Sequence, residues 1–529
     1  MLDIVLSGGL LVDGTGAPAR RADLGISGDS IAAIGDLSRE TAGRTLSMAG
    51  LTVAPGFIDM HSHSDWRLWS NRRAESKIRQ GVTTEVVGNC GFSPAPVSDE
   101  FRDEMKAFAL YRPAGMDFSW RSMGEYLRRY GDGGIALNVA QLVGHGTVRL
   151  AAMGFARRAP TARELASMER LVDESMADGA CGLATGLIYA PGSYAATEEI
   201  VALARRAGAA GGFYASHIRG EGPTLLDAVG EAIRIGREGG LPVQVSHIKA
   251  AGRPNWGRVA EALALIDEAR GEDLDVTADV YPYTASSTTL RTLLPDWALE
   301  GGIERMLERL GDPSMRARIR EDLMGTSAIL TRGLGWEDIM IAYSPSRPDA
   351  QGRRLSEIAA ASGADPLDAA LDLIAAERGG GYMILFQLDE ADLRRALAHP
   401  QVMIGSDGSA LAADGELAAG KPHPRSYGTF PRVLGRYVRE QSTLVLEEAV
   451  RKMTAMPARR LGLADRGVLA VGARADVVAL DPGRVQDLAT YEDPHRYAQG
   501  IDWVLVNGRV VIERGQHTGA LPGRVLRAA

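Results

Sequence analysis

Between residue 56 and about residue 455, short apolar runs alternate with long segments rich in Ala, Arg and Glu. Segments such as TARELASMERLVDESMADG and TLLDAVGEAIRIGREG repeat apolar residues at helical spacing. Such alternation is typical of βα units, in which the strands form a parallel sheet. No other feature of the sequence constrains the fold as strongly.

Eight of the apolar runs qualify as strands, the number that a closed (β/α)8 barrel requires. They span residues 56–60, 83–88, 135–142, 180–185, 211–216, 242–246, 274–280 and 402–406. We therefore predict an α/β fold whose catalytic domain, residues 56–455, is a TIM-like (β/α)8 barrel.

The two ends of the chain have a different texture. Residues 1–55 give short β-like runs separated by Gly and Asp turns, and residues 456–529 repeat this pattern in GVLAVGARADVVALDP and WVLVNGRVVIERG. We expect these segments to be the N- and C-terminal parts of one small β-sandwich domain.

Side chains that bind metals follow the predicted strands at matching positions. Four of the nine histidines are in this set, and all its members lie at or just past a strand end: His61, His63, Cys90, His217, His247 and Asp407. His61 and His63 are two residues apart, so they share one face of the first strand. The carboxyl ends of barrel strands form the face where catalytic groups gather.

Each residue alone has a more ordinary explanation. A lone buried Cys is usually an inert apolar group, and a His at a strand end is more often a hydrogen-bonded core residue. Their joint occurrence at strand ends favours a metal site instead. Cys181 lies within the predicted fourth strand, so we assign it to the core.

This set of side chains suits zinc, which takes His nitrogen, Cys thiolate and carboxylate oxygen and leaves a position for water in catalytic sites. A zinc-bound water has a pKa near ~7. Asp407 would accept a proton from that water and return it to the leaving nitrogen. Six ligands exceed the needs of one zinc, so the site is either binuclear or one metal in a partly vacant binuclear frame.

Composition excludes several other functions. The net charge of −8 argues against a nucleic-acid binder, and no apolar run approaches the roughly 18 residues of a membrane span. Two cysteines do not make a disulfide scaffold, and the N-terminus lacks the features of a signal peptide. We expect a cytoplasmic protein whose partner is a small-molecule substrate.

With PGFIDMHSHSD opening the barrel, a β region before it and GARADVVALDP near the end, the chain resembles the amidohydrolase superfamily. Many members that hydrolyse amides carry a carboxylated lysine on strand four, but GACGLATGLIYAPG contains no lysine. The Cys in GVTTEVVGNCGFSPAP instead resembles the D-aminoacylase, or N-acyl-D-amino-acid deacylase, branch. SHIRGEG, VSHIKAAGRPNWG, VYPYTASST and HPRSYGTFPRVLG also resemble this branch.

The resemblance implies zinc-dependent hydrolysis of N-acyl-D-amino acids to a carboxylate and a free D-amino acid. It implies a tightly bound zinc on Cys90, His217 and His247, and a weaker second site on His61, His63 and Asp407. Asp407 would be the general base and then the acid. Four further residues would contact the substrate: Lys249, Tyr281 and Ser287 at its α-carboxylate, and Tyr189 beside it.

More than a hundred residues separate the seventh predicted strand from Asp407, far more than an ordinary βα connection. We expect a helical insertion at about 290–350 that covers the pocket as a lid. The whole connection contains several arginines, among them Arg291, Arg332, Arg353 and Arg354. Arginines in the lid would suit an acidic substrate side chain, whereas apolar residues there would suit leucine or methionine.

Two other functions remain open. One is a cyclic-amide hydrolase of the hydantoinase or dihydropyrimidinase kind, although the missing strand-four lysine counts against it. The other is an inactive barrel that serves as a binding protein, although none of the six ligands is missing. The sequence also leaves open the oligomeric state, the choice between Tyr281 and Tyr283, and the roles of His145, His423 and Arg425.

Overall fold

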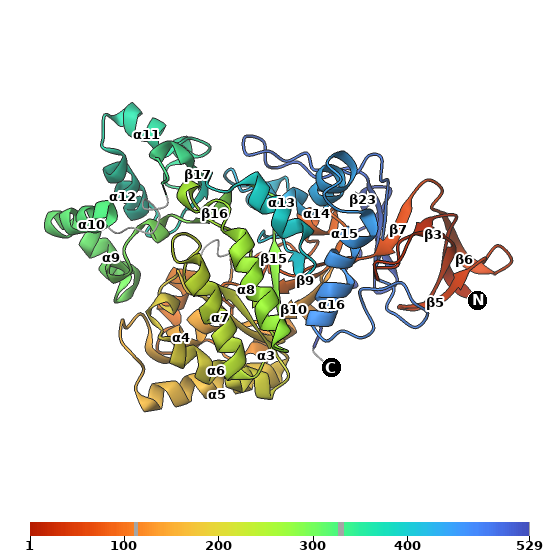
Figure 1. Ribbon diagram of the computed structural model, residues 1–529, viewed down its shortest axis with the longest axis horizontal. Helices are drawn as coiled ribbons and strands as arrows, with labels where there is room; N and C mark the ends of the chain where they lie inside the picture. Colours follow the sequence, from red (N-terminus) through yellow and green to blue (C-terminus); the bar gives the residue numbers. More distant parts are fainter. Residues whose placement is uncertain (110–114, 326–332, 528–529) are drawn as a thin grey trace.

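The computed structural model describes residues 1–109, 115–325 and 333–527. It is an α/β structure with several sheets, and its longest run of parallel strands lies in the middle of the molecule (Figure 1). Arg332 of the expected insertion lies outside the described residues. Among the described residues, no helix has the length and apolar character needed to cross a membrane.

The central strands form two parallel sheets, in the orders β10-β9-β8 and β11-β12-β13-β14-β15-β19. Their bounds are β8 (Phe57–Asp59), β9 (Val82–Val87), β10 (Asn138–Gln141), β11 (Val143–Gly144), β12 (Gly182–Gly186), β13 (Phe213–His217), β14 (Val243–Val245), β15 (Val276–Val280) and β19 (Val402–Ile404). Each of the eight predicted runs overlaps one of these strands, and the short β11 was not predicted as a strand of its own.

Two details connect the parallel sheets. A single residue separates β10 in the first sheet from β11 in the second. On the other side, Ser62 after β8 and Gly408 after β19 form a parallel bridge. The ends of β8 and β19 are therefore neighbours, although more than three hundred residues separate them in the chain.

Helices alternate with these strands, as the apolar spacing predicts. Thr161 and Glu164 form a capping box at the start of α5, and Gly179 ends that helix at a φ of 114°. The helices between β10 and β19 that precede the insertion are α4 (His145–Met153), α5 (Ala162–Asp178), α6 (Thr197–Ala209), α7 (Leu225–Gly239) and α8 (Val259–Gly271). The other helices of the central region are α1 (Glu75–Ile78), α2 (Arg102–Phe108), α3 (Met123–Gly131), α14 (Arg425–Arg432), the π-helix Val433–Glu440, α15 (Leu446–Met453) and α16 (Ala455–Arg460).

Although the C-terminus itself lies beside the central region, strands of the N-terminal and C-terminal segments form a separate β region at one end of the molecule (Figure 1). Its sheets have the orders β5-β4-β1-β6 and β23-β22-β21-β20-β7-β2-β3. The strands are β1 (Leu2–Ser7), β2 (Leu10–Leu11), β3 (Arg20–Arg21), β4 (Asp23–Ser27), β5 (Ser30–Gly35), β6 (Ala42–Ser47), β7 (Thr52–Pro55), β20 (Val477–Leu480), β21 (Ile501–Val506), β22 (Arg509–Glu513) and β23 (Gln516–His517).

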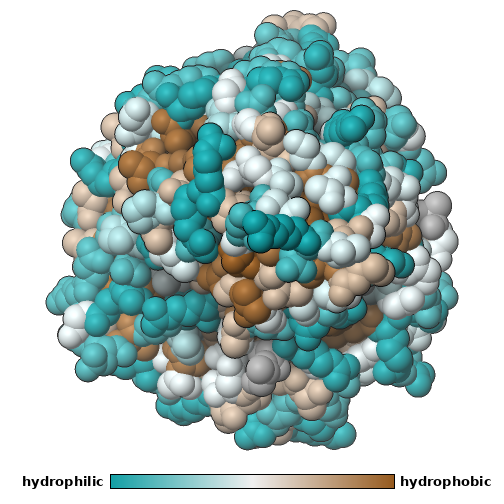
Figure 2. Space-filling view, turned by 90° about the vertical axis from the view of Figure 1, so that its right-hand side faces the viewer, coloured by the Kyte–Doolittle hydropathy of each residue, from teal (hydrophilic) through white to brown (hydrophobic). Residues whose placement is uncertain are grey.

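Both sheets of this β region contribute to one apolar cluster, which includes Leu24 and Ile26 of the first sheet and Val53 and Val477 of the second. Antiparallel pairing of β7 with β20 joins the N-terminal part to the C-terminal part. Figure 2 views the molecule from this end, where hydrophilic side chains are spread over the face with apolar side chains between them.

The long connection from β15 to β19 forms the opposite end of the molecule (Figure 1). It contains helices but also an antiparallel sheet of order β16-β18-β17. The insertion expected at about 290–350 therefore has strands as well as helices, and it continues beyond residue 350. Its main elements are β16 (Ser286–Thr289), α9 (Gly302–Gly311), α10 (Pro313–Gly325), β17 (Ile339–Tyr343), α11 (Leu355–Ser362), α12 (Pro366–Ala376), β18 (Tyr382–Leu385) and α13 (Glu390–Ala398). A strand as short and polar as SSTT lacks the alternation that reveals strands in a sequence.

Candidate metal centre

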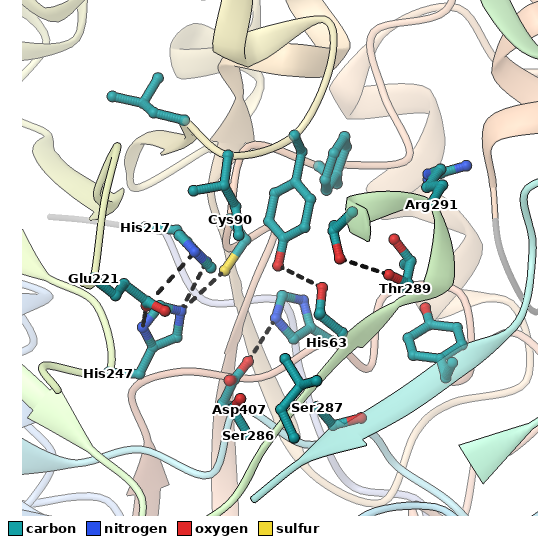
Figure 3. Close-up of a pocket in the computed structure, with 18 of the residues that line it drawn as sticks. His63, Cys90, His217, Glu221, His247, Ser286, Ser287, Thr289, Arg291 and Asp407 are labelled. Carbon is teal, nitrogen blue, oxygen red and sulfur yellow. Dashed lines mark hydrogen bonds and ion pairs between the residues drawn. The ribbon is translucent and has the colours of Figure 1, made fainter. Parts of the chain in front are cut away.

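The six predicted ligands come together at the carboxyl ends of the parallel strands. His61 and His63 follow β8, Cys90 follows β9, and His217 is the last residue of β13. His247 follows β14, and Asp407 follows β19. All but His61 line a cavity of about 540 Å³ (Figure 3), and His61 is completely buried.

Cys90, His217 and His247 form one half of the centre. The Sγ atom of Cys90 lies 3.7 Å from Nε2 of His247, which in turn lies 2.9 Å from Nδ1 of His217. Ligand atoms of a tetrahedral zinc stand about 3.3–3.8 Å apart. His247 therefore lies close to both the sulfur and the second imidazole. Among the described residues, the groups whose ligand atoms all lie within 4.8 Å of one another are His61, Cys90, His247 and Asp407, and His217, Glu221 and His247.

The other half contains His61, His63 and Asp407. Oδ1 of Asp407 lies 2.9 Å from Nε2 of His63 and 3.4 Å from Nε2 of His61. Cys90 also borders this half, because its Sγ atom lies 3.3 Å from Nε2 of His61. Since the sulfur lies between the two halves, the donor set fits either one or two metal ions.

The two cysteines differ sharply in their electrostatics. Burial raises the pKa of the Cys90 thiol, but His61 and His63 more than offset burial and hold this pKa well below its usual range. Burial without such neighbours raises the pKa of the Cys181 thiol to about 12. Cys181 belongs to an apolar cluster, so only Cys90 is poised to bind a cation as a thiolate.

Asp407 is also held in its charged form. Burial raises the pKa of this carboxyl, but Arg425 and then His61 lower it well below its usual range. Nη1 of Arg425 lies 2.7 Å from Oδ2 of Asp407. The sequence left the role of Arg425 open, because its contact with Asp407 depends on the path of the loop after β19, which the sequence does not predict.

Three of the predicted ligands have an unusual backbone. Cys90, His247 and Asp407 have φ angles of 54°, 35° and 49°, in the left-handed region that residues with a side chain rarely adopt. Such a conformation costs about 1–3 kcal/mol and persists only where the surroundings hold it. The left-handed conformation at all three residues indicates that the fold fixes the directions of their side chains, although this conformation lowers the free energy of unfolding.

Two carboxylates that were not predicted orient the imidazoles. Oδ1 of Asp279 lies 3.1 Å from Nδ1 of His61, and Oε1 of Glu221 lies 3.2 Å from Nδ1 of His247. Histidines that bind metals commonly donate their second ring nitrogen in this way. Two features of the sequence could have pointed to these carboxylates. Asp279 lies near the end of the seventh predicted strand, and Glu221 lies four residues after His217.

The four predicted substrate contacts all line the cavity: Lys249, Tyr281, Ser287 and Tyr189. The ammonium of Lys249 lies 2.5 Å from Oε1 of Glu221, which holds it in position. The hydroxyl of Tyr189 contacts Oγ1 of Thr288 at 3.1 Å. The buried hydroxyl of Tyr281 has no hydrogen-bond partner among the described residues.

The remaining candidates have different surroundings. Tyr283 does not line the main cavity; the guanidinium of Arg432 lies over its ring. His423 lines the cavity and its Nε2 atom lies 3.0 Å from the carbonyl oxygen of Ala285. His145 is buried away from the cavity lining, with Nε2 2.9 Å from Oε1 of Glu199.

Comparison with protein families gives a match to the amidohydrolase family over residues 44–512. The chain belongs to this family. The amidohydrolase is 42% identical over 524 residues to a D-aminoacylase of Alcaligenes xylosoxydans xylosoxydans, covering 99% of the chain and 97% of that relative. It is also 42% identical over 528 residues to an N-acyl-D-glutamate deacylase of the same organism, covering 99% and 96%. The resemblance to the D-aminoacylase branch is confirmed.

Solved structures agree with this assignment. The amidohydrolase matches N-acyl-D-glutamate deacylase from Bordetella bronchiseptica, solved with zinc and a phosphonate inhibitor, with a TM-score of 0.84, 39% identity and complete coverage of both chains. A D-aminoacylase structure matches with a TM-score of 0.83 and 40% identity, again over both complete chains. A D-hydantoinase matches with a TM-score of 0.56 and 16% identity over both complete chains, which indicates a common fold only.

Proposed function

We propose that this amidohydrolase uses zinc to hydrolyse N-acyl-D-amino acids to a carboxylate and a free D-amino acid. The observation that carries the proposal is the position of the Cys90 sulfur, between the imidazoles of both halves of one centre. The names of relatives at 42% identity over nearly the whole chain give the substrate class.

We further infer that the parallel strands close into a (β/α)8 barrel. The bridge between Ser62 and Gly408 and the short step from β10 to β11 support closure. The domains are residues 1–55 and 456–529, which form a β-sandwich, and residues 56–455, which form the barrel. The connection after β15 contributes Thr292, Leu293 and Leu323 to the cavity lining, which supports its role as a lid.

We propose that Cys90, His217 and His247 hold the tight zinc, and that His61, His63 and Asp407 offer a weaker second site. The thiolate character of Cys90 supports the first assignment. When bound, zinc polarises the acyl carbonyl and makes water a stronger acid. Asp279 and Glu221 keep the imidazoles oriented from behind.

Asp407 handles the proton in this proposal. Its charged state at neutral pH, favoured by Arg425, makes it an acceptor for a proton of the attacking water. The same carboxyl then donates this proton to the nitrogen of the amide as the C–N bond breaks. Arg425 therefore both orients Asp407 and presents positive charge to the cavity.

The substrate's α-carboxylate binds at Lys249, Tyr281 and Ser287, with Tyr189 beside the substrate. Lys249 is only 8% exposed and supplies charge, and the unpaired hydroxyl of Tyr281 supplies a donor. Fixing the carboxylate and the acyl carbonyl at two separate points leaves one direction for the side chain. That restriction selects the D-enantiomer.

Assays of paired substrates test the proposal. The zinc enzyme is mixed with N-acetyl-D- and N-acetyl-L-amino acids, and release of the free amine is measured. Cleavage of the D-compounds alone is expected. Cleavage of hydantoins but not of linear amides would favour the cyclic-amide hydrolase, a reading that the absence of lysine in β12 already disfavours. Zinc binding without any amide cleavage would favour the inactive barrel.

A further inference from the structure

A buried lysine that contacts no predicted ligand side chain lies beneath the strand ends of the centre. Lys77 of α1 is 0% exposed. Its Nζ atom lies 2.7 Å from Oδ2 of Asp59 in β8 and 3.1 Å from Oε1 of Glu85 in β9. Burial of an ammonium group is costly unless it is paired, and here two buried carboxylates surround it.

The same ammonium reaches both neighbours of Asp407. Nζ of Lys77 donates to Oγ of Ser406 at 2.6 Å and to the carbonyl oxygen of Gly408 at 3.3 Å. Ser406 in turn donates from Oγ to Oδ2 of Asp59 at 2.5 Å and accepts from the Gly408 amide at 3.0 Å. The residues immediately before and after Asp407 are thus both tied to one buried charge.

Glu85 extends this network to His63. Its Oε1 atom accepts hydrogen bonds from Oγ of Ser62 at 2.6 Å and from Oγ of Ser64 at 2.8 Å. These two serines flank His63 in the sequence. Contacts of Lys77 with Glu85 and Ser406 therefore join the segment that carries His63 to the segment that carries Asp407.

Backbone hydrogen bonds complete the connection between these two segments. The Asp407 amide donates to the His61 carbonyl oxygen at 2.7 Å, and the His63 amide donates to the Gly408 carbonyl oxygen at 2.8 Å. Asp407 has the left-handed backbone described above, which must be held by its neighbours. Lys77 donates hydrogen bonds to the residues on both sides of Asp407.

We propose that Lys77 is a positioning residue that fixes the carboxylate of Asp407 relative to His63. A buried ion pair contributes little stability compared with apolar residues of the same volume, so a stabilising role alone does not account for this charge. The proposal rests on the proposed function, because the geometry that it fixes matters for amide hydrolysis and for the weaker metal site.

The chain offers a matched control in Lys452. This lysine is also 0% exposed, and its Nζ atom donates to the Val402 carbonyl oxygen at 2.9 Å. It therefore holds the beginning of β19, whereas Lys77 holds the segment after the end of the same strand. The variants to compare are Lys77→Met, Ser406→Ala and Lys452→Met, each with Tm measured.

Turnover is the first measurement. We expect Lys77→Met and Ser406→Ala to lower kcat, the former about 100-fold, because small displacements of a reacting group have effects of that size. KM changes by less than about twofold, because the contacts to the α-carboxylate are intact. Lys452→Met keeps kcat near the wild-type value even if its Tm falls. An equal loss of kcat in Lys452→Met would overturn the proposal.

Zinc titration of the one-zinc protein is the second measurement, and it does not depend on activity. Ser406→Ala removes no charge, so it remains testable if Lys77→Met does not fold. We expect it to weaken the second zinc site about 10-fold or more while the first zinc stays bound. Unchanged zinc affinity together with unchanged kcat would refute the role of Lys77. A weakened second site in a protein that cleaves no N-acyl-D-amino acid would support the positioning role and reject the proposed function.

Discussion

Nη1 of Arg425 lies 2.7 Å from Oδ2 of Asp407, and both side chains are almost completely buried at the wall of the cavity. This contact joins the first turn of α14 to the residue that follows β19 by three positions. It keeps a buried carboxyl charged, which a proton acceptor requires.

Arg425→Gln should move the acidic limb of the kcat/KM profile to higher pH. Arg425 lowers the pKa of Asp407, so its removal raises that pKa and a larger fraction of Asp407 is protonated at a given pH. The limb moves to higher pH because the loss of the neighbouring positive charge makes the charged carboxylate less favourable. An acidic limb at the wild-type position would show that Asp407 does not depend on Arg425. Arg432→Gln, which removes a guanidinium outside the cavity lining, is the control.

Cys90→Ala should abolish zinc retention, whereas Cys181→Ala should not. Both cysteines are buried, but only Cys90 has imidazoles close to its sulfur. Metal content after dialysis against a weak chelator checks this difference. If Cys90→Ala kept one zinc per chain, the tight site would have to be assigned to other residues.

Asp407→Asn should keep the tight zinc and lose turnover. The amide preserves the shape of the side chain but cannot accept and return a proton, and general acid–base catalysis is worth about 10²–10⁴-fold. Metal analysis and kcat are measured on the same preparation. A rate within threefold of wild type would refute the proton-transfer role.

Tyr281→Phe and Tyr283→Phe should differ in their effect on substrate binding. The Tyr281 hydroxyl is buried at the cavity wall without a partner, whereas Tyr283 does not line the main cavity. Loss of one hydrogen bond to a charged group costs about 1.5–3 kcal/mol, so we expect KM to rise at least tenfold in Tyr281→Phe. KM in Tyr283→Phe should stay near the wild-type value. The opposite pattern would exchange the roles of the two tyrosines.

The periodicity of the sequence was sufficient to find the parallel strands and the residues at their ends. Apolar runs mark buried strands because both faces of a parallel sheet are covered, and a residue just past such a run has a predictable location. For this reason Cys90 and Asp407, more than three hundred residues apart, could be assigned to one centre before their distance was known.

Contacts that depend on loop paths could not be predicted in this way. Glu221 lies in a loop and Arg425 begins α14 directly after a loop, and the sequence carries no periodic signal at either place. Lys77 resembles an ordinary surface lysine in the sequence, since lysines are rarely buried. Its contact with Ser406 depends on how α1 packs against the segment after β19, which the sequence does not predict. The sheet within the connection after β15 was missed because its strands are short and one is polar.

The pairing of β7 with β20 has a consequence for biosynthesis. The two strands lie more than four hundred residues apart, so when the ribosome has just made β7, its neighbour β2 is present but β20 is not. The edge of β7 that pairs with β20 therefore stays open until nearly the whole chain has been made, and chaperones can bind it during that time.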